Sequence, residues 1–143
     1  MFKFKYNNIG EINADNGLFF QYTLIKRIIR PMIKIKIKGK TNKDCDFLLD
    51  TGSPYNLLNT ETAVRIGIDT TKDGEPIFLS GIGGYIECKK TWTRIRIGNN
   101  PDFPITFYLS PNVPNILGIW EDSILSKFAI VFDKDKFGLF LTG

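Results

Sequence analysis

The stretch Phe47-Leu48-Leu49-Asp50-Thr51-Gly52-Ser53 decides the fold of this 143-residue chain. Three apolar residues run without polar alternation into a carboxylate, a pattern typical of a strand buried on both faces. Thr51 and Gly52 then predict a tight turn, since glycine allows backbone angles and close approaches that a Cβ resists. Asp50 is therefore expected at the end of a buried strand, at the edge of a hydrophobic core.

The residues after this stretch separate a catalytic turn from an ordinary one. An isolated Asp-Thr-Gly-Ser is most simply a turn, because Asp, Gly and Ser are common turn formers. Here a strand candidate at 55–59 and a short helix candidate at 60–67 follow it directly. Asn59-Thr60 offers a helix cap, and Gly67 a helix stop.

Two further motifs lie at fixed places later in the chain. Ser80-Gly81-Ile82-Gly83-Gly84 separates the strand patterns 75–80 and 85–97, which predicts a long hairpin with a flexible tip. Without Asp50 this would be an ordinary glycine-rich turn; with Asp50 it is interpreted as a flap over a site. Asn115-Ile116-Leu117-Gly118 predicts a short buried strand, in which Leu117 is assigned to core packing.

The remaining pattern predicts an all-β protein. Further strands are expected at 18–25, 32–38, 103–109, 129–132 and 137–141, with a helical turn within 121–128. Roughly nine or ten short strands with one or two small helices fit a closed or sandwich-like β architecture. The length suits one domain, 17–143, preceded by a polar N-terminal extension, 1–16.

Composition excludes several classes of chemistry. The chain has no histidine, which excludes Ser-His and Cys-His catalytic units and a histidine metal site. Its two cysteines, Cys45 and Cys88, do not make a disulfide framework and are expected as free thiols in a reducing compartment. We find no signal-peptide pattern and no run approaching the roughly 18 apolar residues of a transmembrane helix. The expectation is therefore a cytoplasmic protein with no membrane partner and no histidine metal site; no other metal and no cofactor are predicted.

The formal charge of +4 raises the question of nucleic-acid binding. Much of the excess alternates with isoleucines, at Lys34, Lys36 and Lys38 and again at Arg94 and Arg96, so it is expected on solvated strand faces. The alternative to a solvated face is a basic β-barrel surface that binds nucleic acid. A mobility-shift assay at increasing salt would detect such binding, because phosphate contacts weaken steeply with salt. No binding motif supports it, and no nucleic-acid partner is predicted.

The three motifs, at these spacings, resemble those of the retropepsin-like aspartic proteases, over roughly residues 17 to 141. The resemblance implies a closed β-barrel of the retropepsin-like acid protease type and an aspartic-type endopeptidase acting on polypeptides. It implies that Asp50, Thr51 and Gly52 are catalytic: Thr51 bonds across a symmetry axis, and Gly52 lets backbone amides approach the carboxylate. Ser53 is expected to donate a further hydrogen bond to Asp50. The residues expected to contact substrate are Ser53, Leu48, Leu57, Gly81, Ile82, Gly83, Gly84 and Ile116.

The chemistry of this class needs two facing carboxylates that share one proton. Only one Asp-Thr-Gly occurs in the chain. Asp69, Asp73 and Asp122 end no long apolar run, and Asp133 begins a charged turn. A symmetric homodimer, with Asp50 from each subunit meeting on the axis, would supply the pair.

One departure from the family concerns the dimer. Retroviral members follow the glycine of the third motif with Arg and then Asp or Asn, whereas this chain has Ile119-Trp120-Glu121-Asp122. The retroviral brace is therefore not expected, and Trp120 is a candidate to pack in its place. The alternative function is a non-catalytic retropepsin-fold binding or dimerisation module. The intact Asp50-Thr51-Gly52 beside a glycine-rich tip favours the enzyme.

Overall fold

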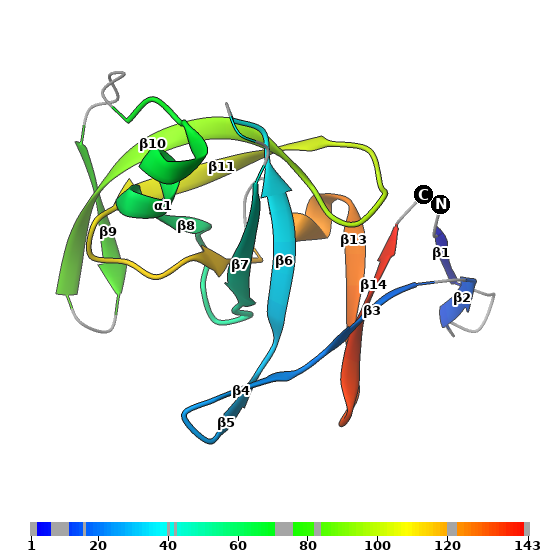
Figure 1. The fold of residues 1–143 in the computed structure, drawn as a ribbon. Helices are drawn as coiled ribbons and strands as arrows, with labels where there is room; N and C mark the ends of the chain where they lie inside the picture. Colours follow the sequence, from blue (N-terminus) through cyan, green and yellow to red (C-terminus); the bar gives the residue numbers. More distant parts are fainter. Residues whose placement is uncertain are drawn as a thin grey trace.

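The strand that directly precedes Asp50 belongs to a closed barrel in the computed structural model (Figure 1). The structure describes residues 3–6, 12–15, 17–39, 41, 43–70, 76–81, 84–119 and 123–141, the first two ranges by their backbone alone. Six strands close the barrel through the pairing of the first with the last: β10 (Gly84–Arg96), β11 (Phe103–Ser110), β8 (Leu57–Asn59), β12 (Ile116–Leu117), β7 (Asp44–Leu49) and β6 (Met32–Ile37). The predicted fold class is confirmed.

The hairpin β6–β7 shows how alternation builds the barrel wall. Ile33, Ile35 and Ile37 of β6 are at most 1% exposed and face the core. The lysines between them face outward, where Lys34 forms an ion pair with Asp46 at 3.6 Å. The predicted solvated position of these cations is confirmed for this strand.

Strand β7 corrects one expectation. Cys45, Phe47 and Leu49 are at most 4% exposed, but Leu48 is only half-buried. The prediction of burial on both faces is therefore wrong at Leu48. Its side of the strand carries Asp46 in solvent and then borders an open pocket beside Asp50.

The one α-helix among the described residues, α1 (Thr60–Ile66), has the predicted ends. The side chain of Asn59 accepts a hydrogen bond from the Glu61 N–H at 2.9 Å, which satisfies a free donor of the first turn. Gly67 ends the helix with a φ of 84°, a left-handed conformation that favours glycine. The helix thus fixes the direction of the chain as it leaves β8.

The other elements surround the barrel. Strand β9 (Pro76–Gly81) pairs with β10 as the predicted long hairpin. A separate sheet contains β13 (Phe128–Phe132), β14 (Lys136–Leu141) and β3 (Leu18–Gln21). The 3-10 helix η1 (Ile124–Ser126) directly precedes β13. Two isolated hairpins complete the described chain: β1 (Lys3–Tyr6) with β2 (Ile12–Asp15), and β4 (Thr23–Ile25) with β5 (Ile28–Arg30).

The N-terminal third differs from its predicted pattern. The expected strand 18–25 is interrupted at Tyr22, and its second half turns back at Lys26-Arg27 to pair with residues 28–30. The described residues therefore contain fourteen strands rather than nine or ten. The division at residue 16 between an extension and the domain stays a prediction.

The barrel interior is filled by aliphatic and aromatic side chains. Phe47 of β7 and Phe107 of β11 pack with ring centroids 5.5 Å apart at its centre, and neither is exposed. Both cysteines are free and buried, as predicted. Within the described part of the chain, no helix is long and apolar enough to cross a bilayer.

Candidate active site

Asp50 lies at the first residue after β7, in a turn whose own backbone orients the carboxylate. The Asp50 N–H donates to the carbonyl of Leu117 at 2.9 Å, and its carbonyl accepts from the Ser53 N–H at 3.1 Å. The Gly52 N–H donates to Asp50 Oδ1 at 2.9 Å. A Cβ on Gly52 would lie 3.3 Å from the same oxygen and crowd it. The turn thus presents a half-buried carboxylate, with Thr51 and Gly52 exposed beside it.

Ser53 does not make its predicted bond to Asp50. Its hydroxyl donates to the carbonyl of Tyr55 at 2.8 Å and accepts from the Tyr55 N–H at 3.2 Å. The side chain therefore closes a second turn directly after the first one. This expectation was wrong because a serine hydroxyl also bonds readily to the backbone two residues on, and here it donates its proton to Tyr55.

Gly118 braces the turn at Asp50 from behind. Its N–H donates to Asn56 Oδ1 at 3.0 Å, and the next residue, Ile119, donates to the carbonyl of Ser53 at 3.1 Å. A Cβ on Gly118 would collide with the carbonyl oxygens of Tyr55 and Ser53. Only glycine lets the strand after Leu117 approach the turn so closely. The predicted Trp120, by contrast, lies outside the described residues.

Two asparagines, Asn56 and the half-buried Asn115, hold this brace, and the sequence predicted a role for neither. Asn56 is 1% exposed, and its Nδ2 donates to the carbonyl of Thr106 at 3.1 Å. Asn115 uses its carbonyl to accept from the Leu48 N–H at 3.0 Å and its Oδ1 to accept from the Asn59 N–H at 2.9 Å. The signal that could have found them is an amide side chain inside an apolar strand pattern, which must find buried partners.

The predicted pocket walls lie side by side. Ile116 is the register partner of Leu48 on one neighbouring strand and of Leu57 on the other. All three are half-buried, and Met32 extends the row beyond Leu48. The three strands thus present one apolar row, which begins two residues before Asp50. Leu117, one residue further, is fully buried in the core, as predicted.

The hairpin β9–β10 continues the apolar row. Ile77 and Leu79 of β9 pack with Cys88, Tyr108 and Leu57 in a second hydrophobic cluster. Burial raises the pKa of the Cys88 thiol, so this group stays neutral and packs as a small apolar side chain. Leu57 therefore joins the row beside Asp50 to the inner face of the hairpin.

The tip of this hairpin is described only at its two ends. Gly81 and Gly84 are register partners, and Gly84 has a φ of 110°. The predicted Ile82 and Gly83 lie outside the described residues. The hairpin itself is confirmed, and its role as a flap stays a prediction.

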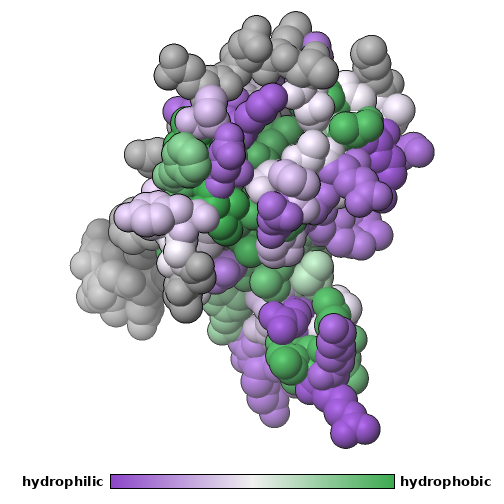
Figure 2. Space-filling view, turned by 90° about the vertical axis from the view of Figure 1, so that its left-hand side faces the viewer, coloured by the Kyte–Doolittle hydropathy of each residue, from purple (hydrophilic) through white to green (hydrophobic). Residues whose placement is uncertain are grey.

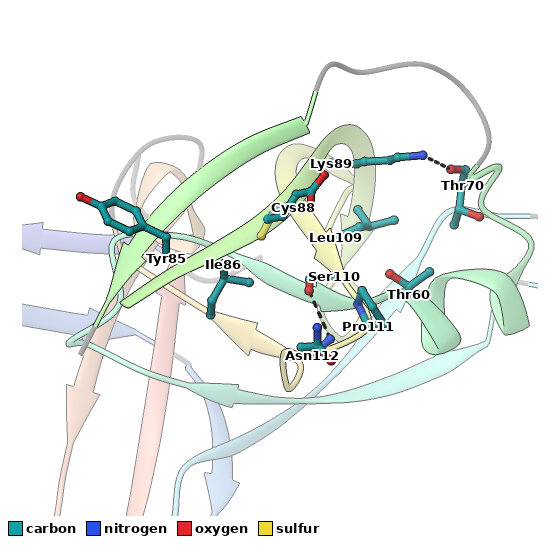
Figure 3. Close-up of a pocket in the computed structure, with 11 residues that line it drawn as sticks. Thr60, Thr70, Tyr85, Ile86, Cys88, Lys89, Leu109, Ser110, Pro111 and Asn112 are labelled. Atoms are coloured by element: carbon teal, nitrogen blue, oxygen red, sulfur yellow. Dashed lines mark hydrogen bonds between the residues drawn. The ribbon is translucent and has the colours of Figure 1, made fainter. Parts of the chain in front are cut away.

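A pocket of about 610 Å³ lies beneath β10, away from Asp50 (Figure 3). Ile86 and Cys88 point into it from the inner face of the strand, while Tyr85 points away. The turn after β11 forms its floor, where the Asn112 N–H donates to Ser110 Oγ at 3.2 Å. The pocket therefore lies under the hairpin and borders the same cluster as Leu57.

A smaller and more open pocket of about 430 Å³ borders Asp50 itself. Arg30 and Pro31 line one part of it, and Phe132 at the end of β13 lines another. In a single copy of the chain, the carboxylate therefore faces an open, partly apolar surface. Neither Arg30 nor Phe132 was predicted here, because their segments are far from Asp50 in sequence.

Comparisons with known proteins agree with this geometry. A family model described as "Aspartyl protease" matches residues 33–119, more than half of the chain. Among solved structures, the chain is similar to a retropepsin-like aspartic protease from Rickettsia conorii, with 19% identity, coverage of 87% of this chain and 90% of that one, and a TM-score of 0.64. A search of curated proteins found no match. The matched segment contains Asp50, its brace and the apolar row, and the chain belongs to the aspartyl protease family, with the retropepsin-like fold.

Proposed function

We propose that the chain is an active aspartic endopeptidase that works as a homodimer, with one Asp50 from each subunit. The observation that carries this proposal is the turn at Asp50. It is braced from behind by Gly118 and Asn56, and its carboxylate accepts a backbone hydrogen bond while facing an open surface. A turn held this firmly around an accessible carboxylate suits a group that acts on a ligand.

The reaction follows from two carboxylates in contact. Two such groups cannot both ionise cheaply, so the pair shares one proton. The ionised member takes a proton from water as the water oxygen attacks the carbonyl carbon of the peptide bond. The protonated member donates a hydrogen bond to the carbonyl oxygen. The C–N bond breaks when the nitrogen receives a proton, which leaves a carboxylic acid and an amine.

The surroundings of Asp50 support a polypeptide substrate with apolar side chains near the cut. The row of Leu48, Ile116 and Leu57 would contact such side chains, and the pocket under β10 extends the same surface. Residues 81–84 would cover the bound peptide. Thr51, which is exposed beside the carboxylate, would contact its symmetry mate.

The experiment compares the parent chain with Asp50→Asn in digestion of an unfolded protein, with and without pepstatin, from acidic to neutral pH. Asn keeps the shape and removes the proton-carrying group, so turnover should fall by at least about 10²- to 10⁴-fold. Parent activity should pass through a maximum on the acidic side of neutrality, because one carboxyl must stay protonated and the other ionised.

Circular dichroism should show both proteins folded. A folded Asp50→Asn variant that cleaves at the parent rate would place the catalytic group elsewhere. A folded parent without any activity would instead favour the binding or dimerisation module.

A further inference from the structure

The hairpin β4–β5 stands apart from the rest of the structure. Its two strands, Thr23–Ile25 and Ile28–Arg30, pair only with each other within the described chain. It projects from the lower end of the molecule, below β6 and away from the barrel (Figure 1). Isolated two-stranded hairpins are marginally stable in water, so this one needs a covering surface.

Both faces of this hairpin carry apolar side chains. Leu24 and Ile29 are register partners on one face, and they are 68% and 65% exposed. Ile25 and Ile28 are partners on the other face, and they are 36% and 52% exposed. Figure 2 shows this lower part of the molecule as a narrow projection that carries hydrophobic side chains among hydrophilic ones. A strand that faces water on one side alternates apolar and polar residues, and this hairpin does not.

The turn of the hairpin also costs conformational energy. Lys26 and Arg27, between the two strands, have φ values of 49° and 65°. Such two-residue turns normally contain Asn or Gly, because other residues disfavour positive φ. Strain of this kind persists where surrounding contacts compensate it. Within the described chain, the hairpin has no further strand to supply those contacts.

The base of the hairpin borders the pocket of Asp50. Arg30 and Pro31 line this pocket together with Asp50, and Phe132 of β13 lines it as well. Phe132 is 45% exposed and its neighbour Val131 is 39% exposed. A second open pocket, of about 390 Å³, separates Ile25 from Met32 and Lys34 of the barrel. The apolar surface of the hairpin thus adjoins the face of the molecule that carries the Asp50 pocket. In the proposed dimer, the second carboxylate must approach Asp50 from this face.

We propose that residues 23–30 form an arm that packs, on both of its faces, against a second copy of this chain. This inference rests on the proposed function, which requires that copy beside Asp50. A two-fold axis near Asp50 places the arm of each subunit on the surface of the other subunit. Each arm contact therefore occurs twice in the dimer, and the apolar side chains of both arms are buried. The arm supplies an intersubunit contact without the Arg that follows the glycine in retroviral members.

The first test uses the parent protein. Hydrogen–deuterium exchange of residues 23–30 is measured at protein concentrations above and below the dimer dissociation constant found by sedimentation. The arm should exchange slowly in the dimer and rapidly in the monomer, whereas α1 should exchange equally in both. Equal exchange of the arm in dimer and monomer would overturn the proposal.

The second test uses the variant Leu24→Asp/Ile29→Asp and the matched control Val64→Asp. Val64 is 59% exposed on α1, far from the arm in Figure 1. The arm variant should raise the dimer dissociation constant by about 100-fold or more, since each dimer loses four buried aliphatic side chains. Activity should return at high protein concentration, and the control should match the parent.

The outcomes separate this proposal from the proposed function. An arm variant that dimerises like the parent overturns the arm and leaves the two-chain site intact. A parent that is active as a stable monomer overturns the two-chain site itself. A misfolded arm variant, detected by circular dichroism, leaves the exchange measurement on the parent to decide.

Discussion

Gly118 sets the distance between the strand β12 and the turn that carries Asp50. A methyl group there would meet two backbone carbonyls, which cannot move without shifting the turn. We expect Gly118→Ala to lower the free energy of unfolding by about 1–3 kcal/mol, as overpacking of a tight site does, and to reduce activity through the misplaced carboxylate. Urea unfolding measures the first effect.

Gly81→Ala is the matched control for this change. A Cβ at Gly81 would meet nothing within 4 Å, so its unfolding free energy should stay within about 0.5 kcal/mol of the parent. Equal stability of the Gly118→Ala and Gly81→Ala variants would show that the close approach behind Asp50 is not needed.

Asp102 forms ion pairs with Lys38 and Arg96 whose contribution to stability depends on pH. The hydrogen bond from Lys38, at 3.1 Å, and that from Arg96, at 2.9 Å, hold the pKa of Asp102 below its ordinary value. A carboxyl with a lowered pKa in the folded state stabilises the fold above the pH where an unfolded Asp titrates, about 4. That contribution is lost as pH falls through the folded-state pKa.

Asp102→Asn should therefore lower the free energy of unfolding at pH 7, and the difference from the parent should shrink in strong acid. Urea unfolding of both proteins at the two pH values measures this, with the exposed turn residue Asp135→Asn as the control. A difference that is the same at both pH values would mean that the two cations do not act through the charge of Asp102.

At the scale of elements, the β9–β10 hairpin tests the flap assignment. Gly84 has a φ of 110°, so a β-branched residue there is strained, whereas its register partner Gly81 has space for a side chain. Gly84→Val should leave the fold largely intact and reduce turnover about tenfold. This is the size expected when a side chain must adopt an unfavourable backbone angle. Gly81→Val should keep more of the activity. Parent-like turnover of Gly84→Val would reduce the tip to an ordinary turn.

The helices and strands show which sequence signals suffice to predict a structural element. The barrel strands and α1 were predictable because local patterns specify them: alternating isoleucines in β6, Asn59 and Gly67 at the ends of α1, and an apolar run before Asp50. The β4–β5 hairpin was missed because Lys26-Arg27 is not a usual turn sequence, and its positive φ values belong to the folded chain. In the candidate site, the turn at Asp50 and the neighbouring apolar row were predictable as structure, whereas their roles in catalysis and substrate binding stay predictions. The brace at Asn56 and the border at Phe132 were not predictable, because both depend on tertiary contacts.

At the scale of the whole molecule, one barrel carries one Asp50 turn and two flanking apolar surfaces. Arg30, at the end of the arm at residues 23–30, and Phe132, at the end of β13, both line the pocket beside Asp50. These 143 residues contain one Asp-Thr-Gly, which is why the proposed site takes its second carboxylate from a second copy of the chain. The cytoplasmic location expected from the composition stays a prediction.

The central claim is that two chains share one catalytic site, and subunit mixing tests it most directly. Parent and Asp50→Asn chains are refolded together in varying ratios at constant total concentration, and peptide cleavage is measured. If only parent dimers are active, activity follows the square of the parent fraction, so an equal mixture retains about one quarter of the parent activity. Activity proportional to the parent fraction, with about one half at equal mixing, would mean that each chain works alone and would contradict the two-chain site.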